Sequence, residues 1–277
     1  YIGADDKQYV QQGNNEAQQR GNLSITTDGS QTNNTITIEG GTTGAKVTLS
    51  NVNINASGAA VSVSGNVELV IAGTNTLRSG PKHAGVEKAD DNGTLTISGF
   101  GTLNAYGGES GAGIGGAWHK NASNIVIEGG TIEANGGNWG AGIGGGHGAA
   151  GQNITIRDGN VTAKPGGEAA GIGGGYQGDG KNITIEGGTV YAESGGGNGP
   201  AAAIGGGRWT GEGENIKITG GNVTLKTVDD DDIYIGNGQQ EAEIDTSKLL
   251  GTITKLNRYD EQVDEIVQDF KITINDK

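Results

Sequence analysis

The chain has 277 residues, a formal net charge of −14 and neither cysteine nor methionine. Its 57 glycines and three prolines show no Gly-X-Y period, which excludes collagen, and its negative charge argues against nucleic acid and anionic membranes as partners. Neutral sugars, cations and basic surfaces remain. A thiol-free, acidic, polar chain is typical of proteins outside the cell, so we expect an extracellular or cell-surface location, and no apolar stretch is long enough to predict a membrane span.

The first part of the chain changes from a polar lead to short apolar runs. Residues 1–20 are rich in Gln and Asn and are expected to cap the first structural unit or to form a flexible lead. After them, branched apolar residues alternate with polar ones, and this period of two predicts short β-strands. The runs are Leu23–Ile25, Ile36–Ile38, Val47–Leu49, Leu69–Ile71 and Leu95–Ile97.

One glycine phrase recurs four times in the middle of the chain. The copies read AGIGGAWH at 112–119, AGIGGGHG at 141–148, AGIGGGYQ at 170–177 and AAIGGGRW at 202–209. Their central residues, Ile114, Ile143, Ile172 and Ile204, lie 29, 29 and 32 residues apart. A fixed period in this range marks a solenoid. Two short alternating strands are predicted after each phrase, beginning with Ile125–Ile127, Ile154–Ile156, Ile183–Ile185 and Ile216–Ile218.

A repeat with two or three short strands buries no hydrophobic face alone, whereas stacked repeats close a continuous core. We therefore predict an all-β fold: a single-stranded, right-handed parallel β-helix over residues 21–239, with its handedness taken from the general chirality of parallel crossovers. Roughly nine coils at strand spacing give a rod on the order of 40 Å long. Residues 240–277 lose the glycine phrase, contain a predicted strand at 270–274, and are expected to cap the rod or to pair with a neighbouring subunit or domain.

Charges recur with the same period and alternate in sign from coil to coil. One column holds Glu128, Arg157 and Glu186, and another holds Lys164, Glu193 and Lys226. Like charges at strand spacing repel, so we interpret both columns as structural ladders.

Planar side chains stand four residues after each central isoleucine. This column and its neighbours supply the candidate carbohydrate-binding residues Trp118, Trp139, His147, Tyr176, Arg208 and Trp209. Rings with polar neighbours suit the faces of sugars, and so few aromatic residues are not expected to gather by chance. The alternative is that the rings cover the glycine-rich corners by stacking on one another.

Aspartates gather at two predicted turns and supply the hard oxygen ligands that calcium prefers. The candidate metal ligands are Asp229, Asp230, Asp231 and Asp232, with Asp90 and Asp91 as a second pair. The alternative for both is a solvated acidic loop. Calcium is the only cofactor that the sequence brings forward.

Catalysis is not expected. Hydrolases and lyases need clustered carboxylates or a basic residue beside an acid. The predicted columns hold Ala, Asn, Thr and single charges that neutralise one another, and Arg157 beside Asp158 is explained by the flanking Glu128 and Glu186. We therefore interpret the chain as a non-enzyme.

The stretch from Val47 to Gly108 resembles a known family. The phrases LSNVNI at 49–54, GTNTL at 73–77 and LTISGFGTL at 95–103 are similar to those of the bacterial cell-surface "carbohydrate-binding domain" family of parallel β-helices, whose fold resembles that of polysaccharide lyases. Coils of the GAGIGGG type accompany such phrases in that family. The resemblance implies secretion, calcium sites and binding of polysaccharide.

Two hypotheses of function follow. In the first, the chain is a secreted or surface module that binds polysaccharide or a surface glycan through the ring column. In the second, it is a structural subunit of an extracellular fibre, stalk or surface layer, which joins copies of itself through coil ends or residues 264–277.

Overall fold

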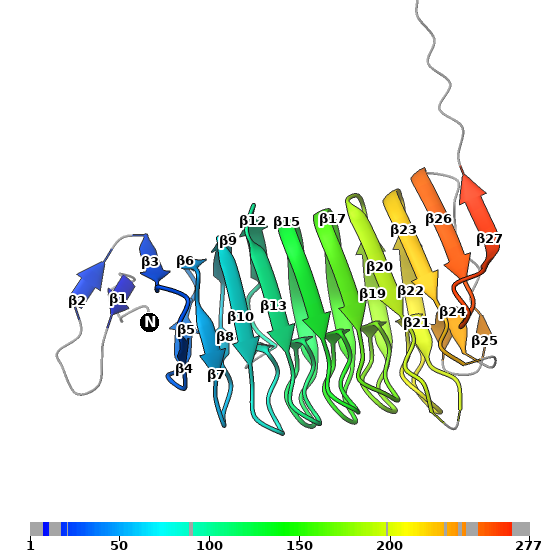
Figure 1. Ribbon diagram of the computed structural model, residues 1–277, viewed down its shortest axis with the longest axis horizontal. Coiled ribbons are helices and arrows are strands. Elements are labelled where there is room, and N and C mark those ends of the chain that lie inside the picture. Colours follow the sequence, from blue (N-terminus) through cyan, green and yellow to red (C-terminus); the bar gives the residue numbers. More distant parts are fainter. Residues whose placement is uncertain are drawn as a thin grey trace, which may run out of the picture.

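The computed structural model describes residues 8–10, 18–20, 22–88, 91–197, 199–229, 232–237, 240–241 and 249–267. These residues form short strands and turns that wind into coils stacked along one axis, giving the rod of Figure 1. Within these ranges no helix has the length and apolar character needed to cross a membrane.

Each coil contributes a strand to up to three faces of the rod. The first face holds β3 (Leu23–Thr26), β6 (Ala45–Ser50), β9 (Val67–Ala72), β12 (Leu95–Gly99), the first parts of β15 (Ala122–Asn135) and β17 (Gly151–Lys164), β19 (Gly180–Ile185) and β22 (Gly213–Ile218). The second face holds β4 (Gln31–Thr32), β7 (Asn53–Asn55), β10 (Thr74–Arg78), β13 (Thr102–Tyr106), the second parts of β15 and β17, β20 (Thr189–Glu193), β23 (Gly220–Lys226) and β26 (Leu250–Leu256).

The third face holds β5 (Ile36–Glu39), β8 (Val61–Ser64), β11 (Val86–Lys88), β14 (Ile114–Gly115), β16 (Ile143–Gly144), β18 (Ile172–Gly173), β21 (Ala202–Gly205) and β24 (Ile233–Asn237). Three strands run antiparallel to their neighbours at the ends: β2 (Gln18–Arg20) beside β1 (Gln8–Val10), β25 (Gln240–Glu241) beside β24, and β27 (Gln262–Val267) beside β26. The third face is a nine-stranded sheet, of which β25 is antiparallel and the other eight strands are parallel. With one parallel strand from each coil, the described part has slightly fewer coils than the nine expected.

The strand register confirms the predicted parallel β-helix. Ile125 pairs with Ile154, Ile154 with Ile183, and Ile183 with Ile216, so each residue lies beside its counterpart one repeat later. The glycine phrases, whose secondary structure the sequence left open, supply the strands β14, β16, β18 and β21 of the third face.

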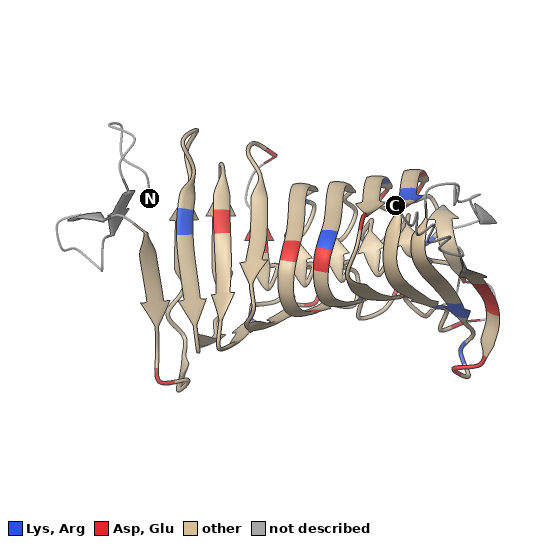
Figure 2. Ribbon diagram, turned by 90° about the horizontal axis from the view of Figure 1, so that it is seen from above, with Lys and Arg blue, Asp and Glu red and all other residues tan. Residues whose placement is uncertain are grey.

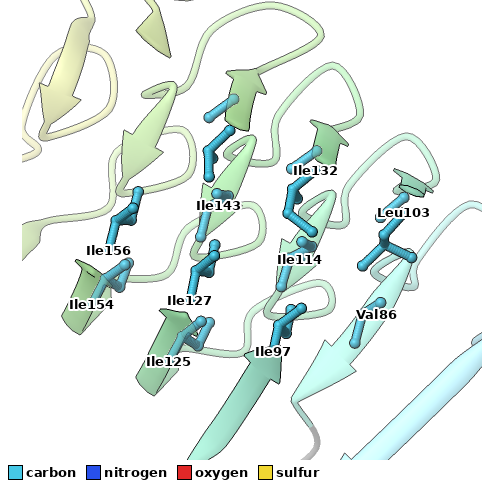
Figure 3. Packing of buried hydrophobic residues seen from close by; sticks show 14 of the residues in the cluster. Val86, Ile97, Leu103, Ile114, Ile125, Ile127, Ile132, Ile143, Ile154 and Ile156 are labelled. Atoms are coloured by element: carbon cyan, nitrogen blue, oxygen red, sulfur yellow. The ribbon is translucent and has the colours of Figure 1, made fainter. Parts of the chain in front are cut away.

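Branched apolar side chains fill the interior as continuous columns. Inward residues of all three faces, such as Ile127, Ile132 and Ile143, are fully buried, and Figure 3 shows like side chains from successive coils packed one above another. Strand residues alternate between the core and solvent, as the period of two requires. This dry column is the main source of stability, since burying each such side chain contributes about 1.5–3 kcal/mol.

Glycine is required beside the central isoleucine because the coils approach each other closely there. Gly144 has φ 141° and would place a Cβ on the carbonyl oxygen of Gly173. Gly115, Gly173 and Gly205 have φ 133–138° and the same kind of neighbour in the next coil. The glycine phrase is therefore a packing requirement of the third face.

Charged positions are sparse along the coils, and both signs occur among them (Figure 2). Arg157 Nη1 lies 2.7 Å from Glu128 Oε1, and Arg157 Nε lies 3.3 Å from Glu186 Oε2, so the first predicted charge ladder is confirmed. In the second column Lys164 Nζ lies 3.5 Å from Glu193 Oε2, whereas Lys226 Nζ contacts Asp260 at 2.6 Å.

The C-terminal segment extends the rod beyond residue 239. β26 continues the second face in parallel on β23, and β27 then turns back against β26. The predicted strand at 270–274 and most of residues 1–20 lie outside the described residues.

Candidate functional site: a ladder of rings along one edge of the rod

A tight turn follows each Ile-Gly strand of the third face and fixes the planar residue. The second turn residue is left-handed in every copy, with φ 55° at His119, 70° at Gly148, 59° at Gln177 and 74° at Trp209. The residue before it donates its backbone N–H to a loop carbonyl of the preceding coil. These bonds are Trp118 to Lys82 (2.9 Å), His147 to Ser110 (2.9 Å), Tyr176 to Trp139 (2.9 Å) and Arg208 to Glu168 (3.3 Å).

Five of these side chains form a group that we call the ring ladder: Trp118, His119, Trp139, His147 and Tyr176. His147 is its centre, with ring centroids 5.1 Å from Trp139, 5.3 Å from His119 and 5.4 Å from Tyr176. Trp118 joins through a hydrogen bond of 3.2 Å from its Nε1 to His147 Nδ1 and lies 4.6 Å from the His119 ring. The structure therefore brings four of the six predicted sugar-binding residues together.

The rings of the ladder partly cover one another. Neighbouring rings are inclined by only 26–46°, so each covers part of the next ring's face. Trp118 is 41% exposed, and within the described part of the chain no group hydrogen bonds to Trp139 Nε1 or Tyr176 Oη. The rings therefore stack on one another, as the alternative reading expected, and sugar binding by them stays a prediction.

The electrostatics favour a neutral His147. Burial lowers the pKa of His147, the neighbouring His119 lowers it further, and Glu168 opposes the shift. Because Nδ1 accepts from Trp118, the remaining proton belongs on Nε2. Lys82 lies beside the ladder, with Nζ 4.2 Å from the centre of the Trp118 ring.

Arg208 does not extend the ladder, which corrects the sequence-based expectation. It is 3% exposed, and its Nη1 forms an ion pair with Glu168 Oε1 in the loop of the preceding coil. Trp209 is 52% exposed, and the Arg208 guanidinium lies 5.4 Å from the centre of its ring. The charged partner draws Arg208 inward, so the exposed ladder ends at Tyr176.

The described aspartates of the acidic run hold a turn. Asp232 accepts hydrogen bonds from Ser194 Oγ (2.6 Å), Ala201 N (3.0 Å), Val228 N (3.2 Å) and Asp229 N (2.9 Å), while Asp229 accepts from Gly197 N (2.7 Å). Burial raises the pKa of Asp232, and the hydrogen bonds from these donors oppose the shift without cancelling it.

The second acidic turn is described only at Asp91, which accepts from Ser123 Oγ at 3.1 Å. Asp90, Asp230 and Asp231 lie outside the described residues. Among those that are described, no group of three or more His, Asp or Glu is arranged to hold a metal ion. Calcium binding stays a prediction.

Sequence reasoning missed His119 as a member of the ring ladder and Lys82 as its neighbour. The signal was present: Lys82, Ser110, Trp139 and Glu168 follow one another at 28, 29 and 29 residues, so they form a second column in the adjoining loops. Reading that column beside the first would have paired Lys82 with Trp118 and Glu168 with Arg208.

A family model described as a beta helix repeat matches residues 95–118, 125–147, 154–176 and 183–208. The four matched segments end at the first residue of each turn, which is Trp118, His147, Tyr176 or Arg208. No curated protein and no solved structure matches the chain. Fold and repeat together define a parallel β-helix protein.

Proposed function

We propose that this protein is a non-catalytic glycan-binding module that works outside the cell or at its surface. The observation that carries the proposal is the ring ladder, in which three successive coils place rings in mutual contact, while Trp139 Nε1 and Tyr176 Oη have no hydrogen-bond partner within the described part of the chain. The acidic, thiol-free composition and the resemblance of residues 47–108 to surface carbohydrate-binding domains support the location and the ligand class.

The ladder suits a chain of sugars that lies along the rod. Rings of successive coils are 5.3–5.4 Å apart, a spacing set by the stacked strands and similar to the length of one hexose unit. Trp139 Nε1 donates a hydrogen bond to a sugar oxygen, Tyr176 Oη donates or accepts one, and the open part of Trp118 contacts an apolar sugar face. Since the turns are held by backbone hydrogen bonds, little side-chain ordering opposes binding.

The test is retardation of purified variants in gels that contain hydroxyethylcellulose, pectin or mucin. Tyr176→Phe keeps the stacking and removes one polar edge, whereas Trp118→Ala combined with Tyr176→Ala (the ladder variant) removes both exposed ends of the ladder. We expect a small loss of retardation for the first and a much larger loss for the second. Tyr259→Ala, at an exposed tyrosine remote from the ladder in sequence, is the matched control and should be retarded as the wild type is.

Retardation of the ladder variant equal to that of the wild type, with folding shown by circular dichroism, would refute glycan binding at this site.

The same gels, run with and without a chelator, test the predicted calcium sites. If the aspartate turns hold a functional calcium ion, chelator should reduce retardation without changing the rings.

Assembly is the second candidate function, and one observation favours it. Among the described strands, β27 lies at the end of its sheet and pairs only with β26, and its Val263 is exposed. An edge strand of this kind accepts a strand from another molecule. We propose that deletion of residues 264–277 leaves folded monomers, and unchanged assembly of the deleted protein would count against a role for this strand.

A further inference from the structure

The most exposed large apolar side chain of the described residues is Phe100, which is not part of the ring ladder. Its relative exposure is 105%, so both faces of its ring are open to solvent. Phe100 stands at the corner that joins β12 to β13, between Gly99 and Gly101. The ladder lacks such an open ring face.

The corner backbone fixes the position of this ring. Gly99 has φ 103°, and a Cβ at Gly99 would overlap the carbonyl oxygen of Ile71 in the preceding coil. A Cβ at Gly101 would likewise overlap the carbonyl oxygen of Gly73, at 2.6 Å. The next coil places Gly129 and Gly130 at the same corner, so side chains do not shield the ring from that side.

A hollow lies on each side of the ring. The first, of about 540 Å³, runs over the preceding coil and carries the part-exposed or exposed hydroxyls of Thr74 and Thr102 on an apolar floor. The second, of about 310 Å³, runs over the following coils and is lined by Glu128, Thr131 and Asp158. Phe100 forms the wall between them.

The polar groups of the second hollow have spare acceptors. Glu128 uses Oε1 for Arg157, and Asp158 uses Oδ1 for the N–H of Gly159, at 2.7 Å each. Within the described part of the chain the second oxygen of each carboxylate has no hydrogen-bond partner. An open aromatic face beside free carboxylate and hydroxyl oxygens matches the apolar face and equatorial hydroxyls of a pyranose.

We propose that Phe100 and its two hollows form a second sugar-binding site, selective for uncharged glycans. Carboxylates of Glu128 and Asp158 accept hydrogen bonds from sugar hydroxyls and repel uronic acids and sulfated sugars. The corner of β12 and β13 lies between a first-face strand and a second-face strand. The ring ladder lies on loops that precede the first-face strands or follow the second-face strands, so the two sites are at opposite ends of these strands. One molecule with both sites therefore links two glycan chains.

The experiment separates this site from the ladder. Light scattering of hydroxyethylcellulose should rise when the wild-type protein is added, because the protein links the polymer chains. Phe100→Ala should show no such rise, although gels that contain the same polymer should still retard it. Phe100→Tyr, which keeps the ring, should restore linking, and Tyr259→Ala should leave it unchanged. Removal of Phe100 leaves no cavity because the side chain is fully exposed.

A direct measurement uses the ladder variant and cellohexaose. Saturation-transfer NMR should show residual contact of the sugar, reduced about tenfold by Phe100→Ala, and tri-galacturonate should show no contact at this corner. If Phe100→Ala links polysaccharide chains as well as the wild type does, the proposal is overturned. It is also overturned if the wild type forms a dimer without sugar and Phe100→Ala is a monomer, since the ring would then bind a second copy of the chain. Failure of the proposed ladder would appear separately, as undiminished retardation of the ladder variant.

Discussion

Asn153 Nδ2 donates a hydrogen bond of 3.1 Å to Oδ1 of Asn124, the residue at the same position one coil earlier. Asn182 donates to Asn153 at 3.1 Å, and Asn215 donates to Asn182 at 2.7 Å. All four residues are left-handed, with φ 52–57°. Asparagine tolerates this conformation and its amide both donates and accepts, so a single residue type meets both needs of the stacked turn.

Replacing Asn153 by alanine should destabilise the rod. The change removes two side-chain hydrogen bonds, each with a net contribution of about 0.5–1.5 kcal/mol, and replaces asparagine by alanine, which tolerates the left-handed region less well. We expect the free energy of unfolding in urea to fall by about 2–4 kcal/mol. Glycine adopts the left-handed conformation easily but lacks the side-chain amide, so the stability of Asn153→Gly should lie between those of the wild type and Asn153→Ala. Equal stability of all three proteins would refute a stabilising role for the asparagine hydrogen bonds.

Replacing Gly144 by alanine should prevent correct stacking of the third face. A Cβ there meets the backbone of Gly173 in the next coil, which does not move without shifting that coil. We expect insoluble protein or a lowered melting temperature. Gly58→Ala is the matched control, because a Cβ at Gly58 meets nothing within 4 Å; equal tolerance of both substitutions would contradict the close approach of the coils.

Ile156 tests the apolar column. It is fully buried between its counterparts Ile127 and Ile185, so Ile156→Ala should lower the free energy of unfolding by about 2–5 kcal/mol. Thr155, the neighbouring strand residue, is only part-buried, and Thr155→Ala should change stability by less than about 1 kcal/mol. Urea titrations of both variants measure the difference, and a similar loss for each would contradict the assignment of Ile156 to the core and Thr155 to the outer face.

The ring ladder should weaken in mild acid. The pKa of His147 is lowered from its ordinary value of 6.5, so near this pH the unfolded chain binds more protons than the folded one. The contribution of His147 to stability is therefore complete above about pH 6.5 and is lost as the pH falls toward the lowered pKa. Protonation also removes the acceptor for Trp118 Nε1.

Tryptophan fluorescence and urea midpoints between about pH 7.5 and about pH 5 measure this effect. His147→Phe keeps a ring at the position but does not titrate, so its midpoint should change less than that of the wild type. Identical pH profiles for the two proteins would show that His147 does not control the ladder.

The repeat period predicted most of the fold. Ile114, Ile143 and Ile172 recur at a constant spacing, and a parallel stack of coils is the arrangement that buries all of them. The same spacing predicted the ion pairs of Arg157, because residues one period apart become neighbours in space.

Sequence spacing did not predict contacts between different positions of the repeat. Arg208 pairs with Glu168, 40 residues away in the loop of the preceding coil, and this ion pair decides that Arg208 is buried. Phe100 was missed for a related reason: its exposure depends on glycines at the same corner in the adjoining coils, which no pattern along one strand reveals.

Glycan binding by the monomeric rod is the central claim, and gel retardation beside size-exclusion chromatography with light scattering tests it most directly. We predict selective retardation by at least one neutral polysaccharide for a protein that elutes as a monomer in the absence of sugar. No retardation in hydroxyethylcellulose, pectin or mucin, together with ordered oligomers or filaments, would contradict the claim and assign the rings to packing within a structural subunit.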